Sequence, residues 1–295
     1  MDLEELRVRI DAVDTELIRL FAERMDISTE IAKYKQANGL PILDAKREEA
    51  KLRSVAEKSR PELEDYTACL FSLLMELSRC HQNRGLGNHS ELSDRISAAI
   101  ENTPALFPEK ATVACQGVEG SESQLACRRL FKKPNEFFFS TYDAVFTAIE
   151  KGLCKYGILP LENSAAGSVN AVYDLMTSHN FRIVRSVRIK VGGDFTRFIC
   201  ISRDLEIYPG ADRTSLRMVL ADKPGSLYKV LSRFYALDIN LSKLESRPMP
   251  DGDFKFMFYF DLDSSVYSPQ FIQLMSELGE LCDEYTYLGS YSEVI

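Results

Sequence analysis

The feature that most constrains this chain is a seam of apolar residues along its first 35 positions. Its apolar residues recur at alternating intervals of three and four positions. This is the heptad pattern of a helix that packs lengthwise against another helix. Its members are Leu3, Leu6, Ile10, Val13, Leu17, Leu20, Ile27, Ile31 and Tyr34. Such a helix is roughly 50 Å long at 1.5 Å per residue, so a single small domain cannot cover its seam. The pattern therefore predicts a partner helix.

Arg24 occupies a position where the heptad pattern predicts an apolar residue. A guanidinium is seldom buried without a partner, so the Arg24 side chain is either exposed to solvent or binds an anion. Lys35 lies almost three turns further on and therefore shares the face. Arg7 is roughly 25 Å from Arg24 along one helix, so only an antiparallel partner helix could bring it to the same site. A plain dimerisation helix with surface cations remains the alternative at this point.

The charge and the cysteine content limit the partners and the compartment. The formal net charge is −8 and no basic stretch offsets it, which argues against a nucleic-acid partner. No apolar segment reaches the length of a membrane span. The seven cysteines show no paired spacing, as for reduced thiols, and three scattered histidines do not indicate a metal site. We expect a cytoplasmic protein with no metal and no cofactor, whose partners are small molecules and copies of itself.

Two further helices are expected after the first, which should end near Asn38-Gly39. Asp44 is a predicted N-cap of a helix to about Lys58, and a third helix follows Pro61. The predicted core face of this third helix is Leu63, Tyr66, Leu70, Leu73 and Leu77. Polar residues lie beside these apolar faces at helical spacing, with Asp44, Arg47 and Glu48 at i, i+3 and i+4, and Ser78 one turn before Gln82.

Residues 1–88 resemble the all-helical chorismate mutase domain, whose chains form an intertwined dimer. The resemblance rests on eight polar residues that match in type at the family's spacing: Arg7, Arg24, Lys35, Asp44, Arg47, Glu48, Ser78 and Gln82. The family rearranges chorismate to prephenate, which requires a dicarboxylate to be held compactly while charge separates.

The resemblance assigns the eight residues to parts of that substrate. Arg7 of the partner chain, Arg24 and Arg47 would hold the carboxylates, with help from Ser78. Lys35 and Gln82 would donate to the ether oxygen, and Glu48, with the Asp44 turn, would hold the ring hydroxyl.

Residues 89–108 are expected to be a linker, after which strands and helices alternate over residues 109–205. This segment looks like the prephenate dehydratase domain, which in the family follows the mutase. The resemblance rests on the turn Gln116 to Gly120, on Glu162-Asn163-Ser164, where a helix to Thr177 is expected to begin, on Gly167-Ser168-Val169, and on Thr196-Arg197-Phe198. The family uses the threonine of that triplet in catalysis.

The segment departs from the family between the strand Phe181 to Val191 and the triplet that begins at Thr196. In the family a second lobe is inserted there and forms the opposing wall of the substrate cleft, whereas here only four residues separate the two. A site with one wall cannot exclude water or position prephenate. We therefore expect a dehydratase remnant that is inactive.

Residues 212–295 read as strand, helix, strand, strand, helix, strand, with a hairpin turn at Asp251-Gly252. They resemble an ACT domain of the phenylalanine-sensing kind. Two effector motifs carry the resemblance: Gly225, Ser226, Leu227 and Tyr228, and then Glu245, Ser246, Arg247 and Pro248. Glycine in the first motif allows a close approach of the backbone to an amino acid.

The sequence therefore predicts a multidomain chain: an all-α chorismate mutase dimer domain, a truncated α/β dehydratase-like domain and an α+β, ferredoxin-like ACT domain. The predicted function is chorismate mutase in phenylalanine biosynthesis, acting on chorismate to give prephenate, with L-phenylalanine as effector and a homodimer formed through the N-terminal helices. One alternative keeps both activities and produces phenylpyruvate. Another is a non-catalytic amino-acid sensor whose helices serve only as a dimerisation scaffold.

Overall fold

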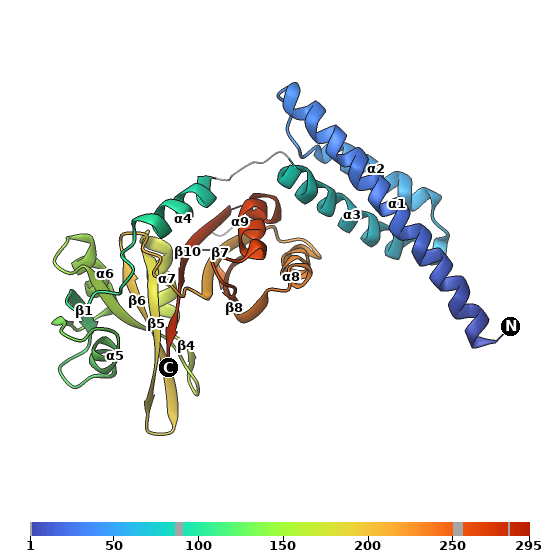
Figure 1. Cartoon of the computed structure of the whole chain (residues 1–295). Coiled ribbons are helices and arrows are strands. Elements are labelled where there is room, and N and C mark those ends of the chain that lie inside the picture. The colour runs from blue at the N-terminus through green and yellow to red at the C-terminus, as the bar shows by residue number, and fades with distance from the viewer. Residues whose placement is uncertain (1, 86–90, 250–255, 283) are drawn as a thin grey trace. The chain divides into compact units, whose positions relative to one another are not determined.

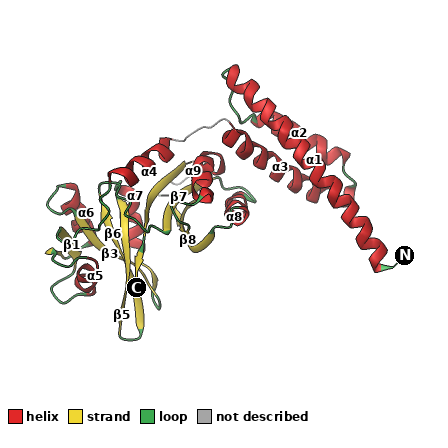
Figure 2. Cartoon of the chain, viewed as in Figure 1, coloured by secondary structure: helices red, strands yellow, loops and turns green. Residues whose placement is uncertain are grey.

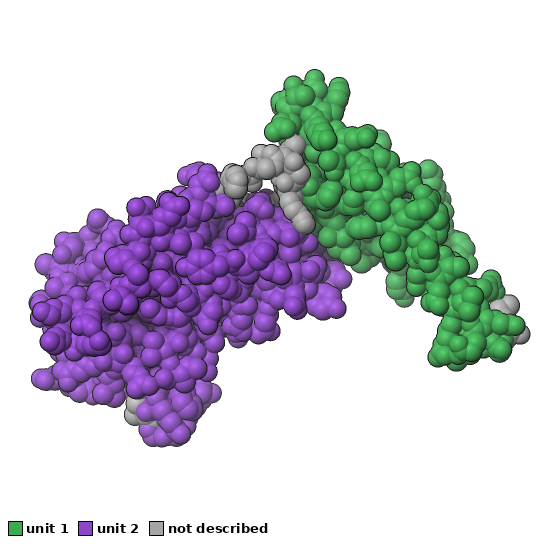
Figure 3. Space-filling view, in the orientation of Figure 1, with its two compact units in different colours: residues 1–89 green, residues 90–295 purple. Residues whose placement is uncertain are grey.

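The computed structural model describes residues 2–85, 91–249, 256–282 and 284–295 of the chain. These residues form two compact units, Met1–His89 and Ser90–Ile295, which Figure 3 shows in different colours. Helices make up the first unit, whereas the strands gather in the second (Figure 2). Within the described residues, no helix is both long enough and apolar enough to cross a membrane.

The first unit consists of three helices and one short 3-10 turn. They are α1 (Leu3–Ala37), α2 (Ala45–Lys58), η1 (Pro61–Leu63) and α3 (Glu64–Gly85). The side chain of Asp2 accepts from the backbone N–H of Glu5 at 2.8 Å and caps α1. Asp44 caps α2 in the same way, since it accepts from the N–H of Arg47 at 3.0 Å. Both α1 and α2 pack against α3 (Figure 1).

The apolar seam of α1 is exposed over its whole length in a single chain. Its nine members range from 43% exposed at Leu6 to 66% at Tyr34. Leu63, Tyr66 and Leu70, predicted as part of the core face of the third helix, are also exposed in a single chain. The buried apolar residues of this unit are few: Met25, Ala32, Val55, Met75 and Cys80. A free unit of this kind would leave much apolar surface in water.

The second unit contains two sheets with helices packed on them. Its helices are α4 (Glu91–Asn102), α5 (Glu122–Leu130), α6 (Tyr142–Glu150), α7 (Asn170–Ser178), α8 (Ser226–Ala236) and α9 (Pro269–Leu281). Its strands are β1 (Thr112–Gln116), β2 (Asn135–Phe139), β3 (Tyr156–Asn163), β4 (Gly167–Ser168), β5 (Arg182–Val191), β6 (Asp194–Ser202), β7 (Arg213–Leu220), β8 (Asn240–Pro248), β9 (Phe256–Asp263), β10 (Glu284–Tyr291) and β11 (Glu293–Val294).

The larger sheet is mixed and has the order β11-β5-β6-β3-β1-β2, with β4 paired to β3. Strand β1 runs parallel to β2 and β3, whereas β6 runs antiparallel to both β3 and β5. Strands β5 and β6 form a tight hairpin in which Val191 faces Asp194, so Gly192-Gly193 is its turn. The strand expected before the Thr196 triplet is thus joined to it directly. Continuous burial along β6, from Thr196 to Ser202, fits a strand covered on both faces.

The C-terminal strands form an antiparallel four-stranded sheet with the order β10-β7-β9-β8. The order of elements along the chain, β7-α8-β8-β9-α9-β10, is the predicted one. The predicted turn at Asp251-Gly252 lies outside the described residues.

Two predicted segments differ in the structure. The expected linker contains α4, whose Leu92, Ile96 and Ala99 are buried in one core with α8 and α9, so it is part of the second unit. The helix expected from Ser164 begins only at Asn170, as α7. Strand β3 continues through Asn163, whose side chain accepts from the N–H groups of Ala165 and Ala166 at 2.9 Å. The turn after β3 is therefore closed by hydrogen bonds of its own residues.

Candidate active site

A cavity of about 420 Å³ lies between the three helices of the first unit. Seven of the eight residues singled out in this unit line it: Arg24, Lys35, Asp44, Arg47, Glu48, Ser78 and Gln82. They come from α1, from α2 with its cap, and from α3. Five cationic side chains and two carboxylates line the cavity in total. The excess of positive charge suits a ligand with more than one negative group.

Arg24 reaches from α1 across to α3. Its Nη1 donates to the hydroxyl of Ser78 and to the carbonyl oxygen of Leu74, the latter at 2.8 Å. Burial lowers the pKa of the Arg24 guanidinium, although the group remains charged near neutral pH. Among the described residues, no carboxylate forms an ion pair with Arg24. Its charge is therefore partly desolvated and has no counter-ion among those residues.

Gln82 is buried on α3, one turn beyond Ser78. Its Nε2 donates to the hydroxyl of Ser28 on α1 at 2.7 Å. The second hydrogen on Nε2 and the buried Oε1 have no hydrogen-bond partner among the described residues. Ser28 was not predicted as a site residue, although it lies one turn after Arg24 on the same face of α1. The Ser28 hydroxyl fixes the orientation of the Gln82 amide at the cavity.

Three other predicted residues are held in place by their neighbours. Glu48 forms an ion pair with Arg79. Arg79 also lines the cavity and was not among the predicted site residues. Lys35 donates from Nζ to the carbonyl oxygen of Ile42 at 2.5 Å, which ties the end of α1 to the loop before α2. Asp44 is engaged as the cap of α2, and it positions the first turn that carries Arg47 and Glu48.

Arg7 does not reach this cavity in a single chain. It lies in the exposed first part of α1 and pairs with Glu4 at 2.5 Å. Its side chain is 61% exposed. The structure thus separates Arg7 from the other seven residues, as the length of the helix requires.

The dehydratase-like residues meet where β3 and β6 pair. Asn163 is directly opposite Thr196 in the register, and its Nδ2 donates to the threonine hydroxyl at 3.0 Å. Ser164 continues the pairing through two hydrogen bonds with the backbone of Phe195. Phe198 is buried in the core of the sheet, so it packs rather than facing a ligand. The structure therefore brings Asn163 and Thr196 together and sets Phe198 apart.

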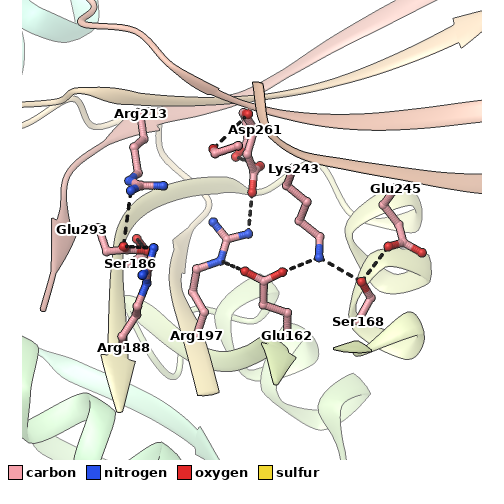
Figure 4. A network of polar contacts seen from close by, with 12 residues as sticks. Glu162, Ser168, Ser186, Arg188, Arg197, Arg213, Lys243, Glu245, Asp261 and Glu293 are labelled. Atoms are coloured by element: carbon pink, nitrogen blue, oxygen red, sulfur yellow. Dashed lines mark hydrogen bonds and ion pairs between the residues drawn. The ribbon is translucent and has the colours of Figure 1, made fainter. Parts of the chain in front are cut away.

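Charged side chains of the C-terminal sheet lie against this motif (Figure 4). Glu162 lies between Arg197, at 2.8 Å, and Lys243 of β8. Arg197 also pairs with Asp261 of β9, and both of these side chains are buried. Strands β8 and β9 thus lie against the charged residues of the motif, while the predicted absence of a second lobe stays a prediction. Sequence reasoning missed this contact since the partners are 64 or more residues away.

The ion pairs of this network shift the pKa values of its members. Burial raises the pKa of the Glu162 carboxyl, but Arg197 and Lys243 outweigh burial and hold it below its ordinary value of 4.5. Burial opposes the charge of Arg197, yet Asp261 and Glu162 raise its pKa above the ordinary range. Both groups are charged at neutral pH.

The two predicted effector segments lie on different elements of the C-terminal part. Gly225 has a positive φ of 86° and caps α8, and Ser226, Leu227 and Tyr228 form its first turn. Glu245, Ser246, Arg247 and Pro248 lie on β8. Glu245 accepts from Ser168, and Arg247 pairs with Asp174 of α7. Among the described residues, no hydrogen bond or ion pair joins the two segments.

Comparison with protein families gives two matches in different parts of the chain. Residues 6–83 match chorismate mutase type II, and residues 113–197 match prephenate dehydratase. The first match lies within the helical unit that holds the cationic cavity, and the second covers strands β1 to β5 and the start of β6 in the larger sheet.

Similar proteins carry both activities in their descriptions. The bifunctional chorismate mutase/prephenate dehydratase of Escherichia coli K12 is 23% identical over 381 aligned positions, covering 97% of this chain and 95% of that protein. The enzyme of the same description from Aquifex aeolicus is 24% identical over 379 positions, covering 100% and 99%. The chain is thus similar over nearly its whole length to bifunctional chorismate mutase/prephenate dehydratases. Both alignments are longer than the chain, so they contain gaps, and the predicted absence of a lobe stays a prediction.

Solved structures resemble the second unit. Prephenate dehydratase from Streptococcus mutans matches with a TM-score of 0.56 and 26% identity, covering 62% of this chain and 99% of that one. A protein described as a quorum-quenching acylase, GqqA, matches with a TM-score of 0.56 and 27% identity, covering 61% and 94%. Prephenate dehydratase from Arthrobacter aurescens, solved with L-Phe, is 19% identical at a TM-score of 0.55, covering 61% and 89%, and shows the shared fold. Because one fold can carry different activities, the shared fold alone does not establish a function.

Proposed function

We propose that the first unit converts chorismate to prephenate in the cavity around Arg24. The observation that carries this proposal is the gathering of seven predicted polar residues, with a partly buried Arg24 that has no carboxylate partner among the described residues. A dicarboxylate substrate would supply the missing counter-ion. Guanidinium groups bind carboxylates through paired hydrogen bonds, so Arg24 and Arg47 are assigned to this contact.

The rearrangement needs donors where negative charge develops as the ether bond breaks. Lys35 and the second Nε2 hydrogen of Gln82 are assigned to the ether oxygen, and Ser28 orients that amide. Glu48, fixed by Arg79, is assigned to the ring hydroxyl. No residue has to transfer a proton or form a covalent bond, since the reaction is an intramolecular rearrangement that depends on orientation and charge.

The site is completed by a second copy of the chain in this proposal. The exposed seam of α1 supports a lengthwise contact with another α1, because an apolar stripe of this size is otherwise exposed to water. An antiparallel partner would bring its Arg7 to the cavity. The scaffold alternative is disfavoured by Arg24, because a dimerisation helix gains nothing from a desolvated cation in its seam.

A second candidate function is prephenate dehydratase activity in the second unit. The family match ends on Thr196 and Arg197, relatives over the whole length carry both activities in their names, and Asn163 holds the Thr196 hydroxyl at 3.0 Å. These observations favour the bifunctional alternative over an inactive remnant. We infer that β8 and β9 supply the wall opposite the motif, because Lys243 and Asp261 contact its charged residues.

The C-terminal part is proposed to be an ACT domain that responds to L-phenylalanine. Its β-α-β-β-α-β order and its four-stranded sheet support the fold. Glu245 and Arg247 reach from the second effector segment to Ser168 and Asp174, next to the Asn163 turn. Effector binding at that segment would therefore act on the dehydratase motif through direct contacts. The proposed domains span residues 1–88, 109–205 and 212–295.

One assay tests both proposed activities. The full chain is given chorismate at neutral pH, and the loss of chorismate, the prephenate formed and the phenylpyruvate formed are followed in the same tube. We expect chorismate to disappear at an enzyme-dependent rate and phenylpyruvate to exceed its acid-catalysed background. Chorismate that persists at its spontaneous rate would contradict the mutase proposal. Prephenate that accumulates without phenylpyruvate would contradict only the second proposal.

A further inference from the structure

A second cavity, of about 360 Å³, lies in the second unit, away from the dehydratase motif. Three elements that Figure 1 labels supply its walls: α4, the start of β5, and β10. The residues that matter are Leu92 and Arg95 of α4, Asn180 and Arg182 beside the start of β5, and Tyr285 of β10. Its size is at the small end of the range for pockets that hold organic ligands.

Arg182 is a buried cation in the wall of this cavity. It is only 7% exposed, and its Nη1 donates to the side-chain oxygen of Asn180 at 2.8 Å and to the carbonyl oxygen of Phe181 at 3.1 Å. Both acceptors are neutral. In the part of the chain that the structure describes, no carboxylate pairs with Arg182. A buried guanidinium is costly without an anionic partner, so the fold leaves this charge uncompensated.

Other cations surround Arg182 rather than anions. Burial lowers the pKa of Arg182, and the nearby charges of Arg95 and Arg217 lower it further. Arg217 donates to the hydroxyl of Thr286 at 2.7 Å, again a neutral acceptor. The carboxylate that lines the cavity is Glu91, which lies in the exposed first turn of α4, one turn before Arg95. The cavity is therefore positive around its buried part.

The other walls of the cavity are apolar. Leu92 is buried on α4, and Tyr285 of β10 is partly buried beside it. An inorganic anion would leave these surfaces without contact, whereas an organic acid would cover them and gain from their burial. Guanidinium groups on α4 and β5 could hold one carboxylate from two sides.

We propose that this cavity binds a small organic acid, with its carboxylate between Arg182 and Arg95 and its apolar body against Leu92 and Tyr285. The ligand would join β10 of the C-terminal sheet to β5, whose hairpin leads into the strand of Thr196. The site is separate from the mutase cavity and from both predicted effector segments. It therefore adds a ligand to those that the proposed function requires.

The test uses the full chain with a single fluorescent reporter. The sequence has no tryptophan, so Tyr285→Trp places one indole in the cavity wall. Phenylacetate is titrated as the organic acid. Phenylacetamide serves as the uncharged analogue of the same shape, and inorganic phosphate as an anion that has no apolar group. We expect saturable fluorescence change with phenylacetate alone. Calorimetry with the unsubstituted chain checks that the reporter has not created the site.

Substitutions then assign the binding to the two guanidinium groups. We expect Arg95→Ala to weaken phenylacetate binding roughly tenfold, the scale for one charged hydrogen bond, and Arg182→Gln to abolish it. Arg203→Ala, an exposed arginine after β6, serves as the control and should change nothing. Because Arg95 is exposed, its variant keeps the test valid even where Arg182→Gln fails to fold. Equal binding of phenylacetamide, binding of phosphate alone, or unchanged binding in Arg95→Ala would overturn the proposal.

Discussion

Arg24 of α1 donates a hydrogen bond to Ser78 of α3, a residue 54 positions later in the chain. This contact locks the two helices together and holds the guanidinium at the cavity that Gln82 also lines. The side chain is thus oriented before any ligand arrives. Preorganised donors of this kind lower the cost of binding an anion and of stabilising charge as it develops.

Gln82 provides the first prediction. Replacing it with Ala should leave the chain folded but slow chorismate turnover by roughly two to three orders of magnitude, the scale for removing one donor to a developing oxyanion. The decrease of chorismate absorbance over time gives the rate, and the helical CD spectrum checks folding. The control is Gln36→Ala, an exposed glutamine on α1, which should keep the full rate. A Gln82→Ala chain as fast as that control would remove Gln82 from the site.

The shared site provides the second prediction. Arg7→Ala and Arg24→Ala chains should each lose most of their activity, because each site needs one arginine from each of the two chains. Mixing the two should restore up to about a quarter of the unsubstituted activity, since half of randomly paired dimers are mixed and only one of their two sites is intact. Exchange of subunits is checked by a size tag on one chain. Mixtures that exchange subunits but stay as slow as either parent would show that Arg7 does not act across the dimer.

The mutase residues could be predicted because the sequence resembles the chorismate mutase domain, while helical spacing indicates which of their side chains share a face. Arg24 and Lys35 are a whole number of turns apart, and Asp44, Arg47 and Glu48 share one helix start. In the structure these five residues line one cavity. Ser28 could not be singled out, because a serine beside an apolar seam has the same pattern whether it is exposed or holds an amide.

The second unit was predicted less fully because its important contacts join distant strands. The alternation along β8 indicates that Lys243 and Glu245 share a face, but not that Glu162 lies opposite them. The predicted start of α7 at Glu162-Asn163-Ser164 is too early, because Asn163 closes a turn after β3 and the helix begins at Asn170. Register and sheet order, which decide both points, are properties of the whole sheet.

Thr196 provides the third prediction. Replacing it with Val removes the hydroxyl that Asn163 contacts while keeping a β-branched side chain in β6. Phenylpyruvate formation from prephenate should fall roughly a hundredfold or more, the range for a group that assists proton transfer. Chorismate turnover by the same variant is the internal control and should not change, because the two sites lie in separate units. Background-level phenylpyruvate from the unsubstituted chain would instead support an inactive remnant.

Glu162 provides a prediction about pH. A carboxyl whose pKa is lower in the folded than in the unfolded chain contributes stability above its unfolded value, and loses that contribution as the pH falls through its folded value. For Glu162 the contribution is therefore full above about pH 4.5 and declines below it. Glu162→Gln should lower the unfolding midpoint of the second unit at pH 7 and matter less as the pH drops below 4.5.

Urea unfolding at pH 7 and at pH 3.5 measures this difference. The control is Glu109→Gln, which removes an exposed ion pair with Lys132 and should have little effect at either pH. A loss of stability in Glu162→Gln that is the same at both pH values would mean that the charge of Glu162 contributes nothing.

The most direct test of the central claim is the rate of chorismate loss in an Arg24→Ala chain compared with Arg19→Ala. Arg19 lies on the same helix but is exposed and paired with Glu16 and Glu23, so its replacement tests helix and charge effects alone. Losing one charged contact to a bound carboxylate costs about 2 kcal/mol or more, so kcat/KM of Arg24→Ala should fall roughly 30-fold or further. The account predicts that Arg19→Ala keeps the unsubstituted rate. Equal rates for the two variants would show that the Arg24 cavity is not where chorismate reacts.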